Sequence, residues 1–381
     1  MKSAIRYSLF FVLLYCAPIT QFTFWAVILV FPFLFFGNPI NSHNCSLNHL
    51  IRIYILLSFV TLITGLISPD LYRPVKDAFL MLGASFVSWC VFYKINNIRD
   101  LKTLNDGVIL AALLFCVIVA MNKIHEGFTF DYSDEGESWL GKNLLALNFY
   151  SGAVCSTLNY FITKKTKYYG ALGLITIFIL LSTSLKIIVS TIFLVFLSFT
   201  MLNRWSKIYI ALFLMIFIPI TSNIFIEYFS SREWIIIQDR LLTLFGLGEY
   251  ATTEMGFIDR REDLLKAALN ILYEHPFGVG LENTRLYMGT YSHNTYIELV
   301  CGSFILLFLF LLFIGEILKT LIIYIKYSTI NLFSFGIFFS ILFVGSAMKI
   351  YDNSVAIFLL VLLYRATIIF GNEFKFRLRY I

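Results

Sequence analysis

Apolar segments of about 20 residues follow one another along most of this chain, and they limit the folds open to it. Hydrophobic residues make up 59% of the 381 residues and charged residues only 14%, whereas soluble domains carry about 25% charged residues. A backbone surrounded by lipid must satisfy its own hydrogen bonds, and an α-helix does so within one segment. We therefore predict an all-α integral membrane protein that is embedded in the lipid bilayer.

About twelve segments are apolar and long enough to be membrane-spanning helices. Pro18 either separates the first two or kinks a single long helix, so residues 1–36 hold one span or two. We prefer two, because Lys2 and Arg6 then lie on the same side as the next basic connection. The expected spans are residues 7–19, 21–36, 50–67, 76–93, 107–122, 143–163, 168–183, 186–202, 207–226, 294–315, 318–347 and 352–370.

The basic residues indicate how these spans are oriented. Lys and Arg gather in the short connections 94–102, 164–167 and 204–207 and in the tail after residue 374, which is typical of cytoplasmic segments. The connection 123–141 instead carries mainly acidic residues and is expected outside. We therefore predict a multi-pass membrane protein with both termini in the cytoplasm. This pattern also explains the net charge of +6 without a nucleic-acid partner.

Motifs for nucleotides and metals are missing from the sequence. It has no Walker A loop, no Gly-rich dinucleotide turn and no Cys or His pair at metal-ligand spacing. The acidic stretch 131–137 lacks a close pair of Asp residues, so a solvated loop is favoured over a divalent-ion site. We expect no cofactor, no metal site and metal-independent chemistry.

One connection, residues 227–292, is far too long to be a bare link between spans nine and ten. We interpret it as a large extracytoplasmic loop inserted into a single polytopic domain, 1–381. Residues 232–245 have the pattern of an amphipathic interfacial helix. A second helix is expected to start at Asp259, because Glu262 three residues later completes a capping box, and to end before Pro276.

Arg260 and Arg261 fall in the first turn of that second helix. Two cations at the positive end of a helix dipole are unfavourable unless an anion offsets them, and Glu262 and Asp263 can do so. An ordinary solvated helix start is therefore one interpretation. The other is a phosphate or pyrophosphate site, because guanidinium groups and free helix N–H groups bind such anions.

His293 and Asn294 open the next apolar segment, at a membrane boundary where ionisable groups are costly and usually functional. The histidine either bonds to backbone or headgroups, or has a functional role at this boundary. Tyr291 lies next to the pair, and aromatic residues here are usually interfacial belt residues.

In order and spacing, these residues resemble the O-antigen ligase and polymerase superfamily. Members show an Arg before a short helix, a turn that alternates Gly with apolar residues after a Pro, and a His-Asn pair opening a Gly-containing span. Here these elements read Arg260 or Arg261, then Pro276-Phe277-Gly278-Val279-Gly280, then His293-Asn294 with Gly302 beyond. The resemblance in motifs covers about residues 140–315.

Two earlier segments resemble the family more weakly. Gly141-Lys142-Asn143 is similar to an Asn-containing element before the sixth span. Residues 182–186 are similar to a Ser-x-Ser-Arg turn, but Leu185 stands where relatives have Arg and the basic residue is Lys186. The ammonium group of Lys186 is a point charge, whereas the guanidinium group of Arg can donate two parallel hydrogen bonds. A lysine whose side chain extends from a helix end to the membrane surface explains this residue equally well.

The resemblance implies a GT-C-like glycosyltransferase fold in the bacterial inner (cytoplasmic) membrane, with the loop 227–292 in the periplasm and a transfer reaction on the periplasmic side. Its donor would be a glycan on undecaprenyl pyrophosphate, and its partners a glycan acceptor and possible chain-length regulator and flippase proteins. His293 would bind the acceptor or serve as the base that accepts the proton of its sugar hydroxyl. Asn294 would hold the imidazole or that hydroxyl, and Tyr291 would offer an aromatic face to a sugar. Arg260, Arg261, Lys186 and Arg285 would lie near the pyrophosphate. A polymerase is preferred to a ligase, which would use the lipid A-core as acceptor. A transporter is disfavoured, because its binding residues would lie near the middle of the bilayer, whereas Lys186, Lys349 and Asp352 are expected near the outer ends of spans.

Overall fold

The computed structural model describes residues 2–16, 49–126, 142–182, 184–200, 258–288, 294–346 and 348–378. Helices account for nearly all of these residues, and no strand occurs among them, which confirms the all-α prediction. The helices are α1 (Lys2–Cys16), α3 (His49–Gly65), α4 (Tyr72–Lys94), α5 (Ile98–Glu126), α6 (Lys142–Thr163), α7 (Lys167–Leu181), α8 (Leu185–Thr200), α12 (Ile258–Glu274), α13 (Thr284–Met288), α14 (Thr295–Gly302), α15 (Phe304–Tyr324), the 3-10 turn η3 (Ile325–Tyr327), α16 (Thr329–Gly345) and α17 (Ser354–Leu378).

Three stretches are long and apolar enough to cross a membrane by length and composition: 98–121, 304–327 and 354–373. Shorter apolar helices accompany them within α1, α3, α7, α8 and α16. The chain thus has the character of a membrane protein. Two of the expected spans, 21–36 and 207–226, and the expected helix 232–245 lie outside the described residues, so the full number of twelve stays a prediction.

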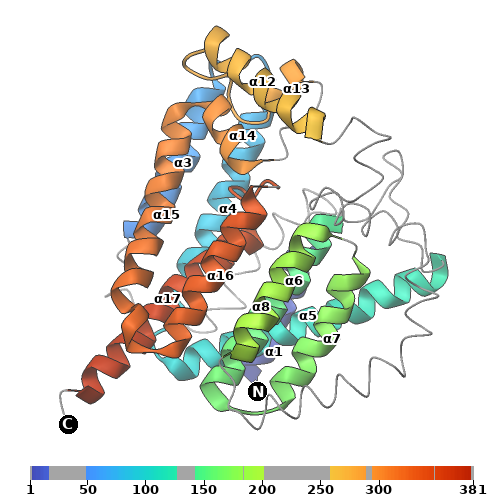
Figure 1. Ribbon diagram of the computed structural model, residues 1–381, viewed down its shortest axis with the longest axis vertical. Helices are drawn as coiled ribbons and strands as arrows, with labels where there is room; N and C mark the ends of the chain where they lie inside the picture. Colours follow the sequence, from blue (N-terminus) through green and yellow to red (C-terminus); the bar gives the residue numbers. More distant parts are fainter. Residues whose placement is uncertain are drawn as a thin grey trace.

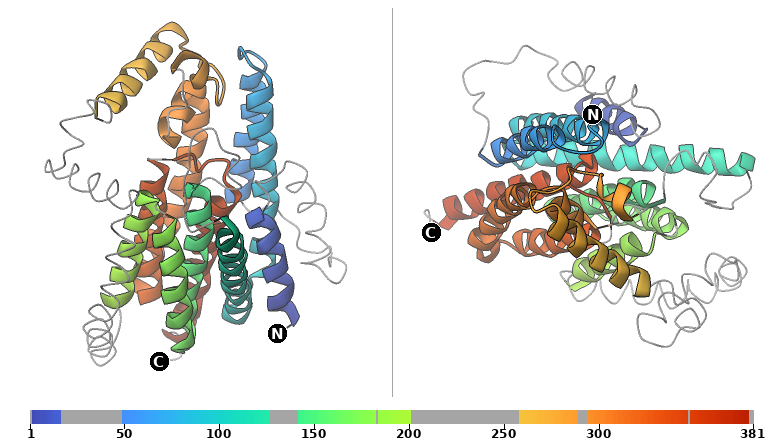
Figure 2. Two further views of the ribbon diagram at one scale, coloured as in Figure 1. Left: turned by 90° about the vertical axis from the view of Figure 1, so that its right-hand side faces the viewer. Right: turned by 90° about the horizontal axis from the view of Figure 1, so that it is seen from above.

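Two groups of helices lie side by side (Figures 1 and 2). One contains α3, α4, α15 and α17, and the other contains α1 and α5 to α8, while α16 packs against both α17 and α8. Aromatic side chains fill the interior, for example Tyr54 against Phe313 with ring centroids 5.1 Å apart and Phe11 against Phe358 at 4.8 Å. These contacts join helices that are far apart in the sequence into one core.

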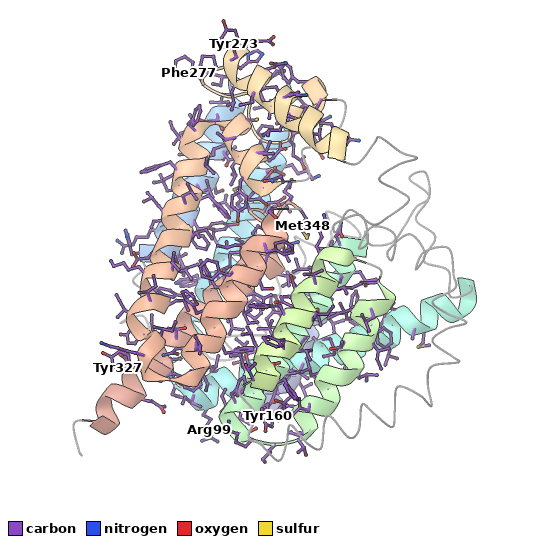
Figure 3. All side chains as sticks on the ribbon, viewed as in Figure 1. Arg99, Tyr160, Tyr273, Phe277, Tyr327 and Met348 are labelled. Carbon is purple, nitrogen blue, oxygen red and sulfur yellow. The ribbon has the colours of Figure 1, made fainter. Side chains whose placement is uncertain are left out.

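The two ends of the bundle differ in what they carry. Arg99, Tyr160 and Tyr327 mark one end, where α1 also begins and α17 finishes (Figure 3). We call it the basic end, because the predicted cytoplasmic connections 94–102 and 164–167 lie there. Met348 lies toward the opposite end, below α12, α13 and α14, and we call this the loop end. All the described basic connections therefore share one end, as the predicted orientation requires.

Two of the predicted span boundaries are wrong. Residues 318–347 were expected as one span, but α15 continues to Tyr324 and α16 begins only at Thr329. The break has a local cause, since the side chain of Ser328 caps α16 by accepting a hydrogen bond from Ile330 N at 3.2 Å. The span 294–315 is also divided, because Ser303 takes an extended conformation between α14 and α15 and caps the latter.

Candidate functional site

The turn Pro276–Gly280 runs against the end of α14. Val279 N donates to Cys301 O at 2.9 Å and Gly280 N donates to Gly302 O at 3.0 Å. Gly278 and Gly280 have φ angles of +89° and +78°, which favour glycine. A Cβ on Gly278 would lie 2.2 Å from Gly302 O. The glycines of the motif therefore permit a close backbone approach between two segments that the sequence analysis listed separately.

α12 covers this junction from outside. It begins at Ile258, one residue before the predicted start, and ends before Pro276 as predicted. Ala268 and Ile271 on its inner face pack with Val279 and Cys301 in a small apolar cluster. The side chains of Arg260 and Arg261 lie outside what the structure describes, although both residues belong to the first turn of α12. The helix that begins with the two arginines is thus packed against the end of α14 by an apolar contact of its second half.

The start of α14 has a defined hydrogen-bond pattern. Asn294 is its N-cap, and the side-chain oxygen accepts from Tyr296 N at 2.9 Å and from Ile297 N at 3.2 Å. This is a structural role that the sequence analysis did not assign to Asn294, and sugar binding by this side chain stays a prediction. His293 and Tyr291 lie outside the described residues.

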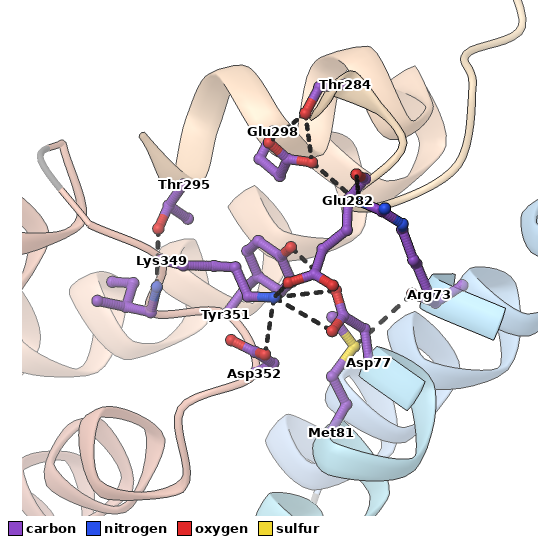
Figure 4. Close-up of polar contacts among 12 residues, drawn as sticks. Arg73, Asp77, Met81, Glu282, Thr284, Thr295, Glu298, Lys349, Tyr351 and Asp352 are labelled. Atoms are coloured by element: carbon purple, nitrogen blue, oxygen red, sulfur yellow. Dashed lines mark hydrogen bonds and ion pairs between the residues drawn. The ribbon is translucent and has the colours of Figure 1, made fainter. Parts of the chain in front are cut away.

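Thr295 joins the start of α14 to the connection 346–353 between α16 and α17. Its hydroxyl donates to Met348 O at 2.7 Å and accepts from Ile350 N at 2.9 Å. One side chain thus holds the backbone on both sides of Lys349 (Figure 4). The residue that follows the His-Asn pair is therefore bonded directly to the segment that presents this lysine.

Lys349 lies among three carboxylates, and we call these four residues the charge cluster (Figure 4). Its Nζ is 3.1 Å from Oδ1 of Asp77, 2.5 Å from Oε1 of Glu282 and 3.0 Å from Oδ2 of Asp352. The Asp77 side chain is fully buried, and that of Lys349 is 21% exposed. The cluster joins α4, the segment after the glycine turn and the connection 346–353.

Opposite charges keep both partners of the Lys349–Glu282 pair ionised. Desolvation alone would lower the pKa of Lys349, but Asp352, Asp77 and Glu282 raise it well above its ordinary value. Burial alone would raise the pKa of Glu282, but Lys349 lowers it overall. The stabilisation from Glu282 is therefore lost as the pH falls through its lowered pKa, and that from Lys349 as the pH rises through its raised pKa.

Further polar contacts fix the walls of the charge cluster. The hydroxyl of Tyr351 donates to Asp77 Oδ2 at 3.1 Å, and that of Tyr54 on α3 donates to the carbonyl oxygen of Tyr351. Arg73 on α4 pairs with Asp70 at 2.8 Å and donates to Glu282 O at 3.4 Å. α3 and α4 are thus connected to both segments that contribute to the cluster.

Glu298 on α14 is buried and holds the chain that follows the glycine turn. Its carboxylate accepts from Glu282 N at 2.8 Å and from the Thr284 hydroxyl at 2.9 and 2.8 Å. A buried carboxylate is costly unless it accepts hydrogen bonds, and these donors satisfy it. Through Glu298, the backbone of Glu282 is fixed at the point where its side chain reaches Lys349.

We predict that Glu298→Ala lowers the free energy of unfolding by about 2 kcal/mol, because it leaves a buried N–H and a buried hydroxyl without their acceptor. Thermal unfolding of the purified protein in detergent measures this change. Glu316→Ala is the matched control, because Glu316 is a glutamate of the next helix and its ion pair with Lys319 is 3.8 Å long and largely exposed on the lysine side. Equal stability of the two variants would contradict the role given to Glu298.

The two weaker motif segments also meet at the loop end. Asn143 follows Lys142 at the start of α6, and its side-chain oxygen accepts from the Ser184 hydroxyl at 2.8 Å. Ser184 precedes α8, whose first turn includes Lys186, a half-buried residue. The structure thus joins two of the predicted segments directly. Arg285, in contrast, is exposed on the short helix α13.

Sequence reasoning missed Asp77, Glu282 and Glu298. One signal was present for Asp77, which lies at the beginning of an apolar segment where an ionisable residue is costly. Glu282 and Glu298 read as ordinary polar residues of a loop and a helix start. Lys349 and Asp352 were recognised as ionisable groups near outer span ends, but not as partners of one another.

Comparisons of this chain with protein-family models, with curated proteins and with solved structures found no match. The resemblance described above therefore rests on the motifs of the sequence alone.

Proposed function

We propose that this protein is an O-antigen (surface polysaccharide) polymerase. It transfers a growing glycan from an undecaprenyl-pyrophosphate carrier to the terminal sugar of a lipid-linked repeat unit at the periplasmic face of the inner membrane. The glycosidic bond to the pyrophosphate breaks, and a bond forms to the acceptor oxygen. The pyrophosphate leaves with the electron pair, and the hydroxyl proton passes to a base.

One observation carries this proposal: motif segments that are far apart in the sequence meet at the loop end. The glycine turn is hydrogen-bonded to residues 301–302, the start of α14 to residues 348–350, and Asn143 to Ser184. Apart from residues 348–350, these are the segments through which the sequence resembles lipid-linked glycan transferases. A transferase that acts on a membrane-anchored donor needs its reacting groups at such an end, within reach of both lipid and water.

The charges at the loop end indicate which residues bind the pyrophosphate and which do not. The charge cluster carries three carboxylates against one ammonium group, so it is unsuited to bind a pyrophosphate. We assign the pyrophosphate to Arg260 or Arg261, with Lys186 and Arg285 as further cations, because guanidinium groups stabilise the charge that develops on the leaving group. His293 is assigned the acceptor hydroxyl, with Lys142, Asn143, Tyr291 and Asn294 as binding groups around it.

Two other functions use the same residues differently. A ligase would share the donor site and transfer the finished glycan to the lipid A-core. A transporter or flippase would need binding groups near the middle of the bilayer. The charge cluster instead lies where α4 begins and α16 and α17 are connected, which favours a reaction at the membrane surface.

Deletion of the gene tests the proposal. We expect lipopolysaccharide in which each core carries a single repeat unit, seen on a gel as one band in place of a ladder, and we expect the wild-type gene on a plasmid to restore the ladder. A bare core together with accumulated lipid-linked polymer would identify a ligase instead. An unchanged ladder would refute both functions.

A further inference from the structure

We propose that Lys349 is a positioning residue for the acceptor side of the site: it holds the start of α14, which His293 and Asn294 precede, against the helix bundle. The role at the acceptor rests on the proposed function, whereas the contacts that hold α14 are features of the structure itself. They are the ion pairs of Lys349 with Asp77 and Glu282 and the two hydrogen bonds of Thr295.

Lys349 links three segments that have no covalent connection nearby. Asp77 belongs to α4 in the bundle, Glu282 to the chain between the glycine turn and α13, and Lys349 itself to the connection 346–353. The ammonium group lies within 3.1 Å of a carboxylate oxygen from both of the other segments. Lys349 is therefore the point where the outer segments are attached to the bundle (Figure 4).

Two separate routes lead from Lys349 to α14. The first is short: Met348 and Ile350, the neighbours of Lys349, are bonded to Thr295 in the first turn of α14. The second passes from Glu282 to Glu298, which lies one turn further along α14. Because both routes end on the same helix, Lys349 controls its position and its rotation about the bundle.

Loss of the positive charge would remove the ion pairs that join the three segments. Asp77, Glu282 and Asp352 would face one another without the ammonium group, so they either repel one another or are relieved only when a buried carboxyl group takes up a proton, and the attachment is lost in both cases. Arg73 does not replace Lys349, because it is already paired with Asp70. The connection 346–353 and the segment with Glu282 would then separate from α4, and α14 would follow.

Cys301 provides a measurement of this movement that does not depend on enzymatic activity. It is fully buried at the end of α14, its thiol faces Ala268 of α12 at 3.8 Å from the carbonyl oxygen, and its own carbonyl oxygen accepts from Val279. When α14 and the glycine turn are held as described, a thiol reagent reaches Cys301 slowly. When they are released, the reaction becomes faster.

The experiment uses the full-length protein in membranes, with the other five cysteines replaced by serine or alanine, and compares Lys349→Met, Lys349→Arg and Lys102→Met. Methionine keeps the length but removes the charge, and arginine keeps the charge. Lys102 is the matched control, because it forms an ion pair of 2.7 Å with Asp106 at the basic end. The rate of maleimide labelling of Cys301 is measured together with polymer formation from lipid-linked repeat units extracted from the deletion strain.

We expect Lys349→Met to speed labelling at least about tenfold and to slow polymer formation about a hundred-fold, since small displacements of a reacting group cost rates of this size. Lys349→Arg should stay near the wild-type protein in both measurements, and so should Lys102→Met. Slow labelling in Lys349→Met would overturn the inference, whatever happens to the activity. Fast labelling in this variant together with no polymer formation by the wild-type protein would support the attachment and refute the proposed function.

Discussion

His293→Ala is expected to reach the membrane at the wild-type level and to form polymer at least about a hundred-fold more slowly, because a positioned general base contributes roughly a hundred-fold to ten-thousand-fold. A sugar hydroxyl is a very weak acid and transfers its proton as the new bond forms. Among the residues of the proposed site, His293 is the group whose ordinary pKa suits that step at neutral pH. Initial rates with extracted lipid-linked repeat units, normalised to the amount of protein, measure the effect.

His275→Ala is the matched control for this prediction. His275 directly follows α12, is partly buried, and has its ring 5.1 Å from that of Tyr287 in an edge contact, so it belongs to the same outer segment without a place in the proposed site. We expect this variant to form polymer at nearly the wild-type rate. If His293→Ala kept the full rate per molecule while its amount in the membrane fell, the histidine would have a structural role at the helix start and the proposed base would be wrong.

Local features of the fold could be predicted well from the sequence. The capping pair Asp259 and Glu262 predicted the start of α12 within one residue, and Pro276 predicted its end. These signals act through neighbouring backbone groups, so the sequence contains all that they need. The boundary between α15 and α16 was harder, because a single Ser328 caps the second helix inside a long apolar run.

The charge cluster could not be predicted in this way. Lys349 and Asp77 are 272 residues apart, and Lys349 and Glu282 are 67 residues apart. No local pattern shows which lysine meets which carboxylate, since packing of whole helices decides it. Sequence reasoning located Lys349 at the correct end of its span, but the partners depended on how α4 packs against α17.

Asn294 shows a different limit of sequence reasoning. The family resemblance assigned it to the imidazole or to a sugar hydroxyl, whereas the hydrogen bonds from Tyr296 N and Ile297 N show a structural role as N-cap. An asparagine before an apolar run is an ordinary N-cap signal, so this role could have been predicted from the sequence. A role of Asn294 at the sugar stays a prediction.

The glycine turn was predictable from its local sequence, but its contact with a distant element was not. A substitution in this turn is expected to have the second large effect on the protein. Its sequence predicted a turn, but the reason for glycine at position 278 is a contact with Gly302 in another element. We expect Gly278→Ala to lower the free energy of unfolding by about 3 kcal/mol, because a φ of +89° strains any L residue and the new Cβ would overlap Gly302 O. The turn would have to move away from α14, and its hydrogen bonds to Cys301 and Gly302 would lengthen.

Thermal unfolding in detergent, followed by size-exclusion chromatography, measures this loss, and Gly315→Ala is the matched control. Gly315 lies within α15, where a new Cβ meets no atom within 4 Å. Alanine there should leave the protein as stable as the wild type or stabilise it by up to about 1 kcal/mol, because glycine is unfavourable inside a helix. If Gly278→Ala unfolded at the same temperature as Gly315→Ala, the turn would not be held against α14. The glycine motif would then give no support to the inference that α14, which His293 precedes, is held in place.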